Sequence, residues 1–488
     1  MIISLSRFLQ RPWRGRAVAG AAAALAVVAI ACGGGGGGGP PTEAGISHLG
    51  IGHLMDDLLF FEEDRSLGRF SEPPAHSIEA IREMAASGDQ QFVPVLVEVL
   101  RLGFQYNDEV AQALTKLTGQ DLGDDWARWA QWLGEQGEVA LPPGFIAWKG
   151  RLLSFQDSRF QDFFNEAYTY RIPIHQIVWG GVARDGIPAL SNPPMLTAEA
   201  AEYLSPGDPV FGICVNGDCR AYPMRILVWH ELVNDVVGGE AIALPYCTLC
   251  FSAIPYRAQV GDRTFTFGTS GLLYQSNKLM FDRQTNSLWS EFTGEPVAGP
   301  LADSGIVLET LPVTFTAWQE WQTLHPDTKV LDIETGYGFE YDLPAGPYGS
   351  YFGSPGPIFP VSELDELETR LAAKDFVFAL RVNGQAKAYP VLTLVEEEPV
   401  VNDAVGGVEL VVVTNPQAGA MRAYERGGLQ FVADSSTTVR DDQDRTWRIT
   451  EEALVLDGGD QRLARLPGNI AYWFGWYSFY PETLLYDE

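Results

Sequence analysis

The sequence predicts an α+β protein: an N-terminal helical, repeat-like region followed by two tandem, related, β-rich units, the second of them degenerate. Three observations lead to this fold class. Residues 46–165 carry apolar residues at helical spacing, whereas the chain after Ile172 has short apolar runs broken by Gly, Pro, Asn and Asp, which is typical of strands. Several motifs of residues 170–335 then recur in the same order in residues 336–488.

The first 31 residues predict a signal peptide. Four arginines and no acidic residue precede an apolar run over residues 17–31, which is too short for a stable membrane span. The run ends at Cys32 in a sequence similar to a bacterial lipobox, and a Gly-rich tether over residues 32–45 follows. We therefore expect export, cleavage after Ala31 and a lipid on Cys32 that anchors the chain to a membrane. The expected location is the outer face of a bacterial cell membrane, or the periplasm or outer membrane. The alternative is an ordinary signal peptide with an incidental cysteine.

The charge of the chain makes nucleic acid a poor partner. Without the four leader arginines the chain carries 29 basic and 63 acidic residues, a net charge of −34. Such a surface repels phosphate backbones and anionic lipid headgroups. We therefore expect the lipid, not surface charge, to hold the protein at its membrane.

The helical region shows a repeated amphipathic pattern. Ile78, Ile81 and Met84 lie on one helical face, and similar patterns follow over residues 95–100 and 110–117, with a glycine closing each segment. Short helices of this kind are similar to HEAT repeats, with a plain helical bundle as the alternative. The region is our candidate contact surface for a protein partner.

An internal duplication organises the rest of the chain. Three blocks match in order: residues 211–223 (FGICVNGDCRAYP) with 378–390 (FALRVNGQAKAYP), 233–239 (VNDVVGG) with 401–407 (VNDAVGG), and, more roughly, 282–289 with 441–447. The Asn-Gly pair in each copy predicts a hairpin with a type I′ turn. Residues shared by both copies are interpreted as framework, and residues present in one copy as candidates for a site. The first copy alone has the sequences Trp-His-Glu at 229–231 and Cys-Thr-Leu-Cys at 247–250.

Cys214 and Cys219 face each other across the first predicted hairpin, as a non-hydrogen-bonded pair whose side chains lie close. In an oxidising compartment this geometry favours a disulfide. The alternative is a four-thiolate zinc site that the pair forms together with Cys247 and Cys250.

Cys247 and Cys250 allow three interpretations: a structural disulfide across a tight turn, a metal site, or a redox-active pair. A thioredoxin-type motif is disfavoured because strand-like sequence, not a helix, follows Cys250. Two thiolates suit copper or zinc, and His230 could supply a nitrogen ligand. Glu231 could be a ligand or could orient the imidazole.

Several ordered motifs are similar to a prokaryotic family of unknown function, domain-of-unknown-function family 3179. The matching segments are 185–190 (DGIPAL), 220–223 (RAYP), 230–235 (HELVND), 246–250 (YCTLC), 267–273 (FGTSGLL), 282–289 (DRQTNSLW), 318–321 (WQEW) and 325–326 (HP). The resemblance is strong over residues 172–331 and looser after that. It implies no reaction, because the family is uncharacterised.

The family pattern includes the His-Glu and Cys-x-x-Cys motifs but not Cys214 or Cys219, so the resemblance favours a local disulfide between those two. It also brings Asp185, Ser270 and Asp282 forward as candidate pocket residues. Asn234 and Trp289 belong to the same motifs, and we interpret them as framework and core.

Three functions from different classes follow. The leading hypothesis is a binding protein with a soft-metal or redox-sensitive site at His230, Glu231, Cys247 and Cys250. The second is a surface scaffold that binds a partner through its helical region and has purely structural disulfides. An enzyme acting at the Cys-x-x-Cys pair ranks last, because the sequence has no phosphate loop, HExxH motif or nucleophile elbow around Ser270.

Overall fold

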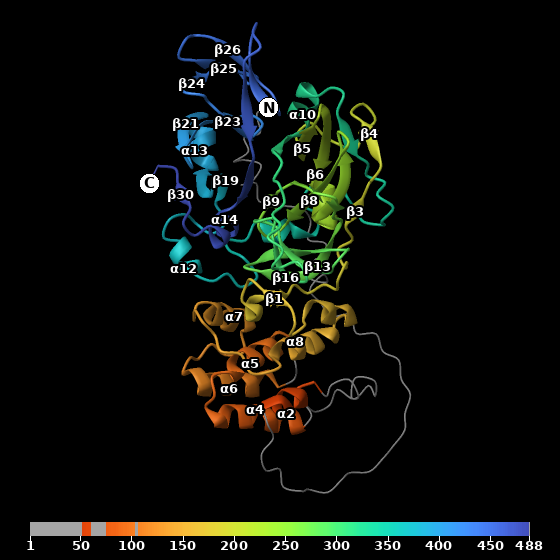
Figure 1. Ribbon diagram of the computed structural model, residues 1–488, viewed down its shortest axis with the longest axis vertical. Helices are drawn as coiled ribbons and strands as arrows, with labels where there is room; N and C mark the ends of the chain where they lie inside the picture. The colour runs from red at the N-terminus through yellow and green to blue at the C-terminus, as the bar shows by residue number, and fades with distance from the viewer. Residues whose placement is uncertain (1–50, 60–74, 103–105, 488) are drawn as a thin grey trace.

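The computed structural model describes residues 51–59, 75–102 and 106–487. The predicted signal peptide, Cys32 and the tether up to residue 45 lie outside these ranges. Figure 1 shows the helical region at one end of the molecule and the two β-rich units side by side beyond it. The described chain is therefore the mixed α+β protein that the sequence predicts. Among its helices, none is both long and apolar enough to cross a membrane.

Short helices form the N-terminal region, as expected. Ile81 and Met84 are fully buried in α4, in agreement with the predicted apolar face. Helix α6 ends where Gly119 takes a φ of +77°, and α7 begins at Asp125, whose side chain accepts a hydrogen bond from Arg128 N at 3.2 Å. The likeness to HEAT repeats stays a prediction. The elements are α2 (Ile51–Asp57), α4 (Ala75–Ser87), α5 (Phe92–Arg101), α6 (Asn107–Thr118), α7 (Trp126–Gly134), α8 (Phe145–Ser154) and the 3₁₀ helix η2 (Ser158–Phe163).

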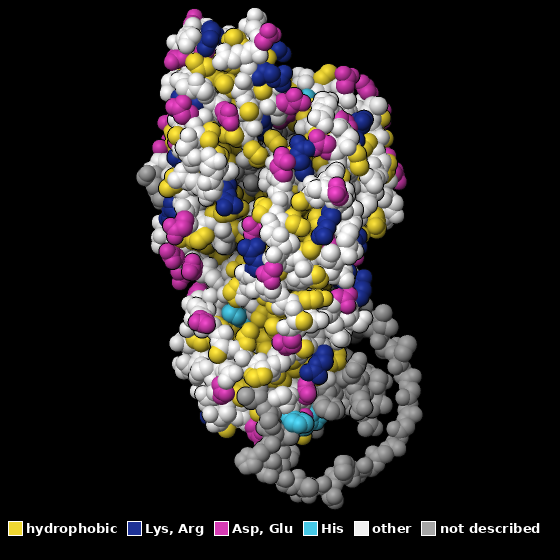
Figure 2. Space-filling model, in the orientation of Figure 1, with side chains coloured by type: hydrophobic (Ala, Val, Ile, Leu, Met, Phe, Trp, Pro, Cys, Tyr) yellow, Lys and Arg dark blue, Asp and Glu magenta, His cyan; other side chains and the backbone are white. Residues whose placement is uncertain are grey.

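The helical region shares a core with the first β unit. Leu272, Leu279 and Phe281 of the six-stranded sheet belong to the same buried cluster as the helices. A buried ion pair between Lys149 and Glu98 lies in this region, and Lys149 Nζ also donates to Ile174 O at 2.8 Å. Figure 2 shows hydrophobic side chains gathered on this face of the molecule where the helices meet the β units. The helical face that packs on the sheet is therefore not available to a partner.

Three larger sheets, beside the two-stranded sheet β11-β12, build the first β unit. Their orders are β1-β16-β15-β14-β13-β2, β10-β8-β7-β3 with β9 beside β8, and β17-β5-β6-β18-β4. The strands are β1 (Thr169–Tyr170), β2 (Val178–Trp179), β3 (Leu190–Ser191), β4 (Met195–Thr197), β5 (Pro209–Val215), β6 (Asp218–Pro223), β7 (Leu232–Val237), β8 (Glu240–Cys247), β9 (Ser252–Ala253), β10 (Tyr256–Arg257), β11 (Gln259–Val260), β12 (Arg263–Thr264), β13 (Phe267–Tyr274), β14 (Asn277–Asp282), β15 (Leu288–Ser290), β16 (Pro296–Gly299), β17 (Thr314–Ala317) and β18 (Lys329–Leu331). Its helices are η3 (Ile174–Gln176), α9 (Met224–His230) and α10 (Trp318–Leu324).

The second unit has a four-stranded sheet, β29-β19-β20-β30, and an eight-stranded sheet, β21-β22-β23-β28-β27-β26-β25-β24, which curls into a nearly closed barrel. The strands are β19 (Phe376–Val382), β20 (Gln385–Pro390), β21 (Val400–Val405), β22 (Val408–Asn415), β23 (Ala420–Glu425), β24 (Phe431–Ala433), β25 (Thr438–Asp441), β26 (Thr446–Ile449), β27 (Ala453–Leu456), β28 (Arg462–Leu466), β29 (Gly468–Tyr472) and β30 (Leu484–Leu485). The helices that precede or join them are η4 (Gly346–Tyr348), α11 (Gly349–Phe352), α12 (Leu364–Leu367), α13 (Val391–Glu396) and α14 (Trp473–Phe479).

The predicted hairpins are present in both units. Asn216 and Gly217 have φ of +50° and +79°, and Asn383 and Gly384 have +49° and +85°, as a type I′ turn requires. Each hairpin is flanked by the same neighbours: β17-β5-β6-β18 in the first unit corresponds to β29-β19-β20-β30 in the second. The last strand of each set runs parallel to its partner. The two units therefore share one topology in this layer.

Shared asparagines hold the barrels together. The Asn402 side chain donates to Phe431 O at 2.7 Å and accepts from Phe431 N at 2.8 Å, which joins β21 to β24. Asn234 makes the same two bonds to Phe267, at 3.0 and 2.8 Å, and joins β7 to β13. Asn234 is thus framework, as its presence in both copies predicts.

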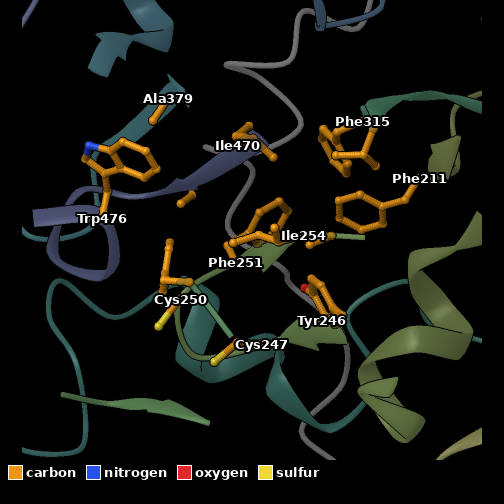
Figure 3. Packing of buried hydrophobic residues seen from close by; sticks show 14 of the residues in the cluster. Phe211, Tyr246, Cys247, Cys250, Phe251, Ile254, Phe315, Ala379, Ile470 and Trp476 are labelled. Carbon is orange, nitrogen blue, oxygen red and sulfur yellow. The ribbon is translucent and has the colours of Figure 1, made fainter. Parts of the chain in front are cut away.

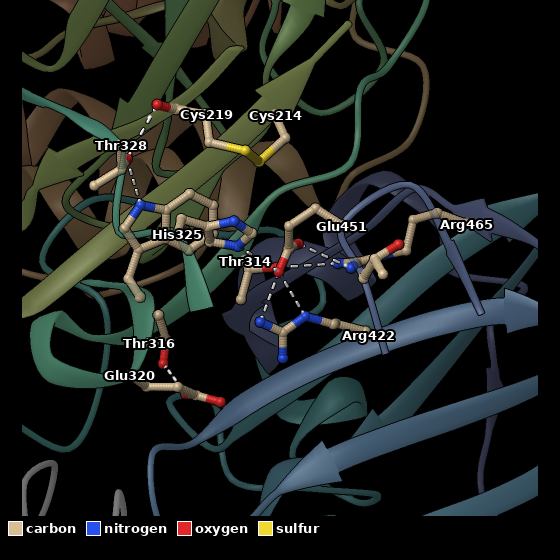
Figure 4. A network of polar contacts seen from close by, with 12 residues as sticks. Cys214, Cys219, Thr314, Thr316, Glu320, His325, Thr328, Arg422, Glu451 and Arg465 are labelled. Carbon is tan, nitrogen blue, oxygen red and sulfur yellow. Dashed lines mark hydrogen bonds and ion pairs between the residues drawn. A yellow bond between two sulfur atoms is a disulfide. The ribbon is translucent and has the colours of Figure 1, made fainter. Parts of the chain in front are cut away.

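A buried ionic network joins the two units. Glu451, between β26 and β27 of the second unit, binds Arg422 Nη2 at 2.7 Å and Arg465 Nη1 at 3.1 Å. From the first unit, the Thr314 hydroxyl of β17 donates to Glu451 Oε2 at 2.7 Å, and His325 Nε2 lies 3.7 Å from Glu451 Oε1. Figure 4 shows these side chains converging on the carboxylate. The relative position of the units therefore depends on a desolvated charge.

Candidate functional site

The hairpin cysteines form the predicted disulfide. Cys214 and Cys219 are directly opposed in the β5–β6 register, with their Cα atoms 4.1 Å apart, and their sulfurs are bonded. His325 lies beside them, and a ring nitrogen and the two sulfur atoms all lie within 4.8 Å of one another (Figure 4). This is the one set of three metal-type ligand atoms at such distances in the described part of the chain. Sulfurs in a disulfide are not thiolate ligands, so the four-thiolate zinc alternative is not realised.

His230 is held away from a metal-like arrangement. It ends α9 in a fully buried position, where Nδ1 lies 2.7 Å from Pro188 O and Nε2 lies 2.6 Å from the Tyr341 hydroxyl. Burial lowers the pKa of His230. Both ring nitrogens therefore have partners, and the structure does not bring them together with Cys247 and Cys250 as three converging ligands.

Cys247 and Cys250 lie at the two ends of a tight turn between β8 and β9. Both are buried free thiols. Cys250 Sγ donates to Ser276 O at 3.4 Å, and Cys247 lies close enough to raise the pKa of the Cys250 thiol. Figure 3 shows the two sulfur atoms on one side of the turn and the Phe251 ring on the other. Cys247 and Cys250 do not form a disulfide in this structure, and a strand rather than a helix follows the turn. The two residues are therefore a pair of adjacent thiols.

Polar groups from β14 and the end of β15 surround the Cys250 thiol. Asn277 Nδ2 lies 3.5 Å from Cys250 Sγ, and the same amide donates to Glu291 Oε2 at 2.9 Å. Ser252 Oγ donates to the other Glu291 oxygen at 3.0 Å. Burial, the neighbouring Cys247 and the Glu291 carboxyl together raise the pKa of the Cys250 thiol well above its usual value. Glu291 is itself fully buried, and burial raises its pKa to about 7.

A buried lysine approaches the same turn from β14. Lys278 Nζ donates to Tyr246 O at 2.8 Å and also bonds Glu231 O. Glu231 has a φ of +54°, a conformation that non-glycine residues rarely adopt, and burial raises the pKa of its carboxyl although Lys278 opposes this. Tyr348 contacts Glu231 Oε1 at 3.5 Å. Glu231 thus lies near the turn through Lys278, a cation that the sequence analysis did not single out.

Four buried polar atoms around this cluster have no hydrogen-bond partner among the residues that the structure describes: Tyr246 Oη, Thr248 Oγ1, Ser276 Oγ and Asn277 Oδ1. Buried polar groups are normally satisfied, and unsatisfied ones call for a specific explanation. Polar groups beside the two free thiols are therefore left without a partner. The cluster of Glu231, Tyr246, Cys247, Cys250, Ser276, Asn277, Lys278 and Glu291 is named the thiol site below.

The three residues expected in a pocket have local partners instead. Asp185 forms an ion pair with Arg283 at 2.7 Å. Ser270 Oγ donates to Leu279 O at 2.5 Å and accepts from Leu272 N, across the bulge in β13. Asp282 accepts from Trp289 Nε1 at 2.9 Å, and the pair Asp441–Trp447 repeats this bond at 2.8 Å in the second unit. These contacts are structural in character.

The second unit has none of the chemistry of the thiol site. In the shared strand register, Glu231 corresponds to Pro399 and Cys247 to Asn415. An equivalent backbone hydrogen bond supports this alignment: Tyr246 N donates to Glu231 O in the first unit, and Thr414 N donates to Pro399 O in the second. The equivalent Asp–Trp pairs then align Lys278 with Thr437 and Glu291 with Ile449. Sequence reasoning missed Lys278 and Glu291. The signal was available: Lys278 lies in a buried strand and Glu291 directly after one, and the counterpart of each in the other copy is uncharged.

Replacing Glu291 by glutamine should flatten the pH dependence of stability between pH 4.5 and 7. Since the folded pKa is about 7 and the ordinary value is 4.5, the native state takes up a proton in this window. Wild-type stability should therefore fall as pH rises from 4.5 to 7, by about 3 kcal/mol at most. Urea unfolding of both proteins across this range measures the difference. Glu295→Gln, a change of a more exposed carboxylate nearby, is the matched control, and an unchanged slope in Glu291→Gln would contradict the assignment.

Comparisons with known proteins agree with this description. Residues 184–483 match the model of a family described as "Protein of unknown function (DUF3179)". No curated protein and no solved structure matches the chain significantly. The matched segment contains the disulfide hairpin, the thiol site and almost all of the second unit, and it spans more than half of the chain. The chain therefore belongs to the DUF3179 family of proteins of unknown function.

Proposed function

We propose that this protein is an envelope binding protein that holds one Cu(I) ion between the thiolates of Cys247 and Cys250. The observation that carries the proposal is a pair of adjacent buried thiols with no third His, Cys or carboxylate ligand atom converging on them within the described ranges. Cu(I) is a soft ion that thiolates select, and it is stable with two sulfur ligands, whereas structural zinc takes about four donors. The donor set therefore favours copper over zinc.

The charge around the turn supports an anionic complex. Two thiolates and one Cu(I) carry a net charge of −1, which must be compensated in a buried site. The Lys278 ammonium group contacts the carbonyl of Tyr246, the residue before Cys247. Burial raises the pKa values of Glu231 and Glu291, that of Glu291 to about 7, which weakens the competition of these two carboxyls for the lysine charge.

The raised pKa of Cys250 argues against thiol catalysis. A nucleophilic or exchanging cysteine reacts through its thiolate, and a buried thiol with a raised pKa has little thiolate at neutral pH. A metal ion instead displaces the proton as it binds. Binding is therefore preferred to an enzyme or a dithiol exchange protein at this site.

The test is anaerobic Cu(I) titration of the reduced protein against a chromophoric Cu(I) chelator. Wild type should retain one equivalent, and a Cys247→Ser/Cys250→Ser double variant should retain none. Since reduction also opens the hairpin disulfide next to His325, a Cys214→Ser/Cys219→Ser variant is the necessary control, and it should still bind copper. Asn415→Ser, at the position that corresponds to Cys247, should also leave binding unchanged. Failure of wild type to bind Cu(I), or isolation of the protein with a Cys247–Cys250 disulfide, would refute the proposal.

We infer that the two β units arose by duplication and that the second kept the framework without the site. The common hairpins, strand orders and asparagine bridges support this inference. Pairs of equivalent bonds add to it: Trp321 Nε1 to Thr328 Oγ1 at 2.9 Å, and Trp476 Nε1 to Thr483 Oγ1 at 2.8 Å. A solved relative with only one of the two units, folded as the first unit is here, would strengthen it; a relative whose units differ in strand order would weaken it.

The lipid anchor at Cys32 is part of the same proposal. It is supported by the arginine-rich start, the short apolar run and the lipobox-like sequence. Metabolic labelling of bacterial cells with an alkyne fatty acid should tag wild type, and Cys32→Ser should abolish the label and release the protein from the membrane fraction. Labelling that persists in Cys32→Ser would exclude this residue as the lipid attachment site.

A further inference from the structure

A cleft separate from the thiol site lies between the two β units. It has a volume of about 600 Å³ and is lined by Met224 and Phe251 of the first unit, by Phe352 and Ser354 after α11, and by residues of β19 and α13. Its walls are mostly apolar, with Val391, Leu392 and Val395 contributed by α13. Pockets of about 300–1,000 Å³ with apolar walls and a few polar groups are typical small-molecule sites.

Aromatic rings form the floor of the cleft. The ring of Phe251 lies 4.9 Å from Phe376 and 5.8 Å from Tyr472, and Phe376 lies 4.7 Å from Tyr472. Tyr472 N also donates to Cys250 O at 2.8 Å. The floor therefore rests on the backbone of the Cys247–Cys250 turn, and its rings, inclined to one another by 42° to 85°, offer apolar faces and edges to a ligand.

One cation faces this apolar space. Lys374 Nζ lies 3.9 Å from the centre of the Tyr351 ring and 4.9 Å from that of Tyr472, and its nearest polar contacts are Tyr351 O and Ser354 Oγ. Burial lowers the pKa of Lys374 to about 8, and among the groups that the structure describes no carboxylate contributes to this shift. Asp375 also lines the cleft, but its carboxylate accepts a hydrogen bond from Ala372 N at 3.0 Å.

We propose that this cleft binds an amphiphile with a single carboxylate head, the head on Lys374 and the apolar body along the floor of Phe251, Phe376 and Tyr472. A partly desolvated ammonium group without an anion destabilises the ligand-free protein, and the carboxylate of a ligand would provide the ion-pair partner. The apolar walls provide the rest of the binding free energy through burial of hydrocarbon. This binding activity does not depend on copper at the thiol site.

The pH dependence follows from the groups that face Lys374. These are Tyr351 and Tyr472, whose ring centres lie 3.9 and 4.9 Å from Lys374 Nζ. Burial raises the pKa of both tyrosines above the ordinary value, so they stay neutral near pH 8. Lysine loses its charge as pH rises through about 8. Affinity for the carboxylate should therefore fall above that pH, by up to about tenfold for each pH unit.

Titration calorimetry on the purified protein tests the proposal, with laurate, dodecanol and dodecyl phosphate below their aggregation concentrations. Laurate should bind one per chain and at least about tenfold more tightly than dodecanol. Lys374→Met should reduce laurate affinity to the level of dodecanol, and Val395→Trp, which fills the cleft, should abolish binding of both. Thermal unfolding of the variants checks that they fold. Equal affinity of wild type for laurate and dodecanol, unchanged laurate binding by Lys374→Met, or binding of dodecyl phosphate without laurate would overturn it.

Discussion

Lys278→Met should weaken Cu(I) binding by about 100-fold, or ~3 kcal/mol, and should do so without changing either thiol. The ammonium group is the buried cation that contacts the Tyr246 carbonyl directly before Cys247. Without it, an anionic dithiolate complex would have no nearby compensating charge in a low-dielectric environment. Methionine has a similar length and no charge, so the packing changes little. Competition titration with the Cu(I) chelator measures the change in affinity.

The matched control is Lys387→Met in the second unit. Lys387 is also a largely buried lysine, and it pairs with Asp403 at 2.7 Å in the second unit, whose sequence contains no cysteine. Its replacement should lower stability and leave Cu(I) affinity unchanged. If Lys278→Met binds Cu(I) as tightly as wild type, the lysine does not compensate the complex, and the proposed charge balance is wrong.

Glu451→Gln should destabilise the protein by about 3–5 kcal/mol at pH 7, because it leaves two buried guanidinium groups without an anion. Burial by itself raises the pKa of Glu451. The charges of Arg422 and Arg465 outweigh burial and hold this pKa well below its usual range. A carboxyl whose pKa is lower in the folded state stabilises the fold fully at pH values above its unfolded pKa, which is near 4.5. This stabilisation is lost as the pH falls through the folded pKa. Wild type should therefore lose stability on acidification below pH 4.5, and Glu451→Gln should lose less.

The neighbouring residue provides the control. Glu452 pairs with Arg462 at 3.3 Å, with both side chains about half exposed, so Glu452→Gln should cost less than about 1 kcal/mol. Chemical unfolding followed by tryptophan fluorescence measures both variants. Because Glu451 joins the two units, hydrogen exchange should also show greater opening at the β17–β23 boundary in Glu451→Gln. Equal effects of the two substitutions would show that the buried network contributes no more than a surface pair.

Local chemistry explains which parts of the fold were predictable. Asn216-Gly217 and Asn383-Gly384 specify type I′ turns by their backbone preferences, and the turn then sets the register that opposes Cys214 and Cys219. The disulfide follows from that register. The helical faces around Ile81 and Met84 follow from a period of 3.6 residues. None of these features depends on distant parts of the chain.

The thiol site was predicted only in part, since the sequence indicated Cys247, Cys250 and Glu231 but grouped them with His230. One residue decides this difference. Glu231 has a φ of +54° directly after α9, and the reversal of the chain there separates its surroundings from those of His230, whose ring turns toward Pro188 and Tyr341. His230 and Glu231 are therefore neighbours in the sequence, but their side chains lie in different surroundings.

Sequence by itself determined the hairpins, the hairpin disulfide, the repeated framework and the family of the chain, because these depend on short-range backbone preference and on recurring motifs. Lys278 and Glu291 lie about 30 to 40 residues beyond the cysteines in the chain, and tertiary structure alone brought them to the turn. Tertiary structure also formed the cleft at Lys374 between the two units. The physical reason is packing between sheets: β14 and β15 belong to the six-stranded sheet and the β8–β9 turn to another, so they meet only when the two sheets pack together. No local pattern therefore encodes the charge environment of the two thiols.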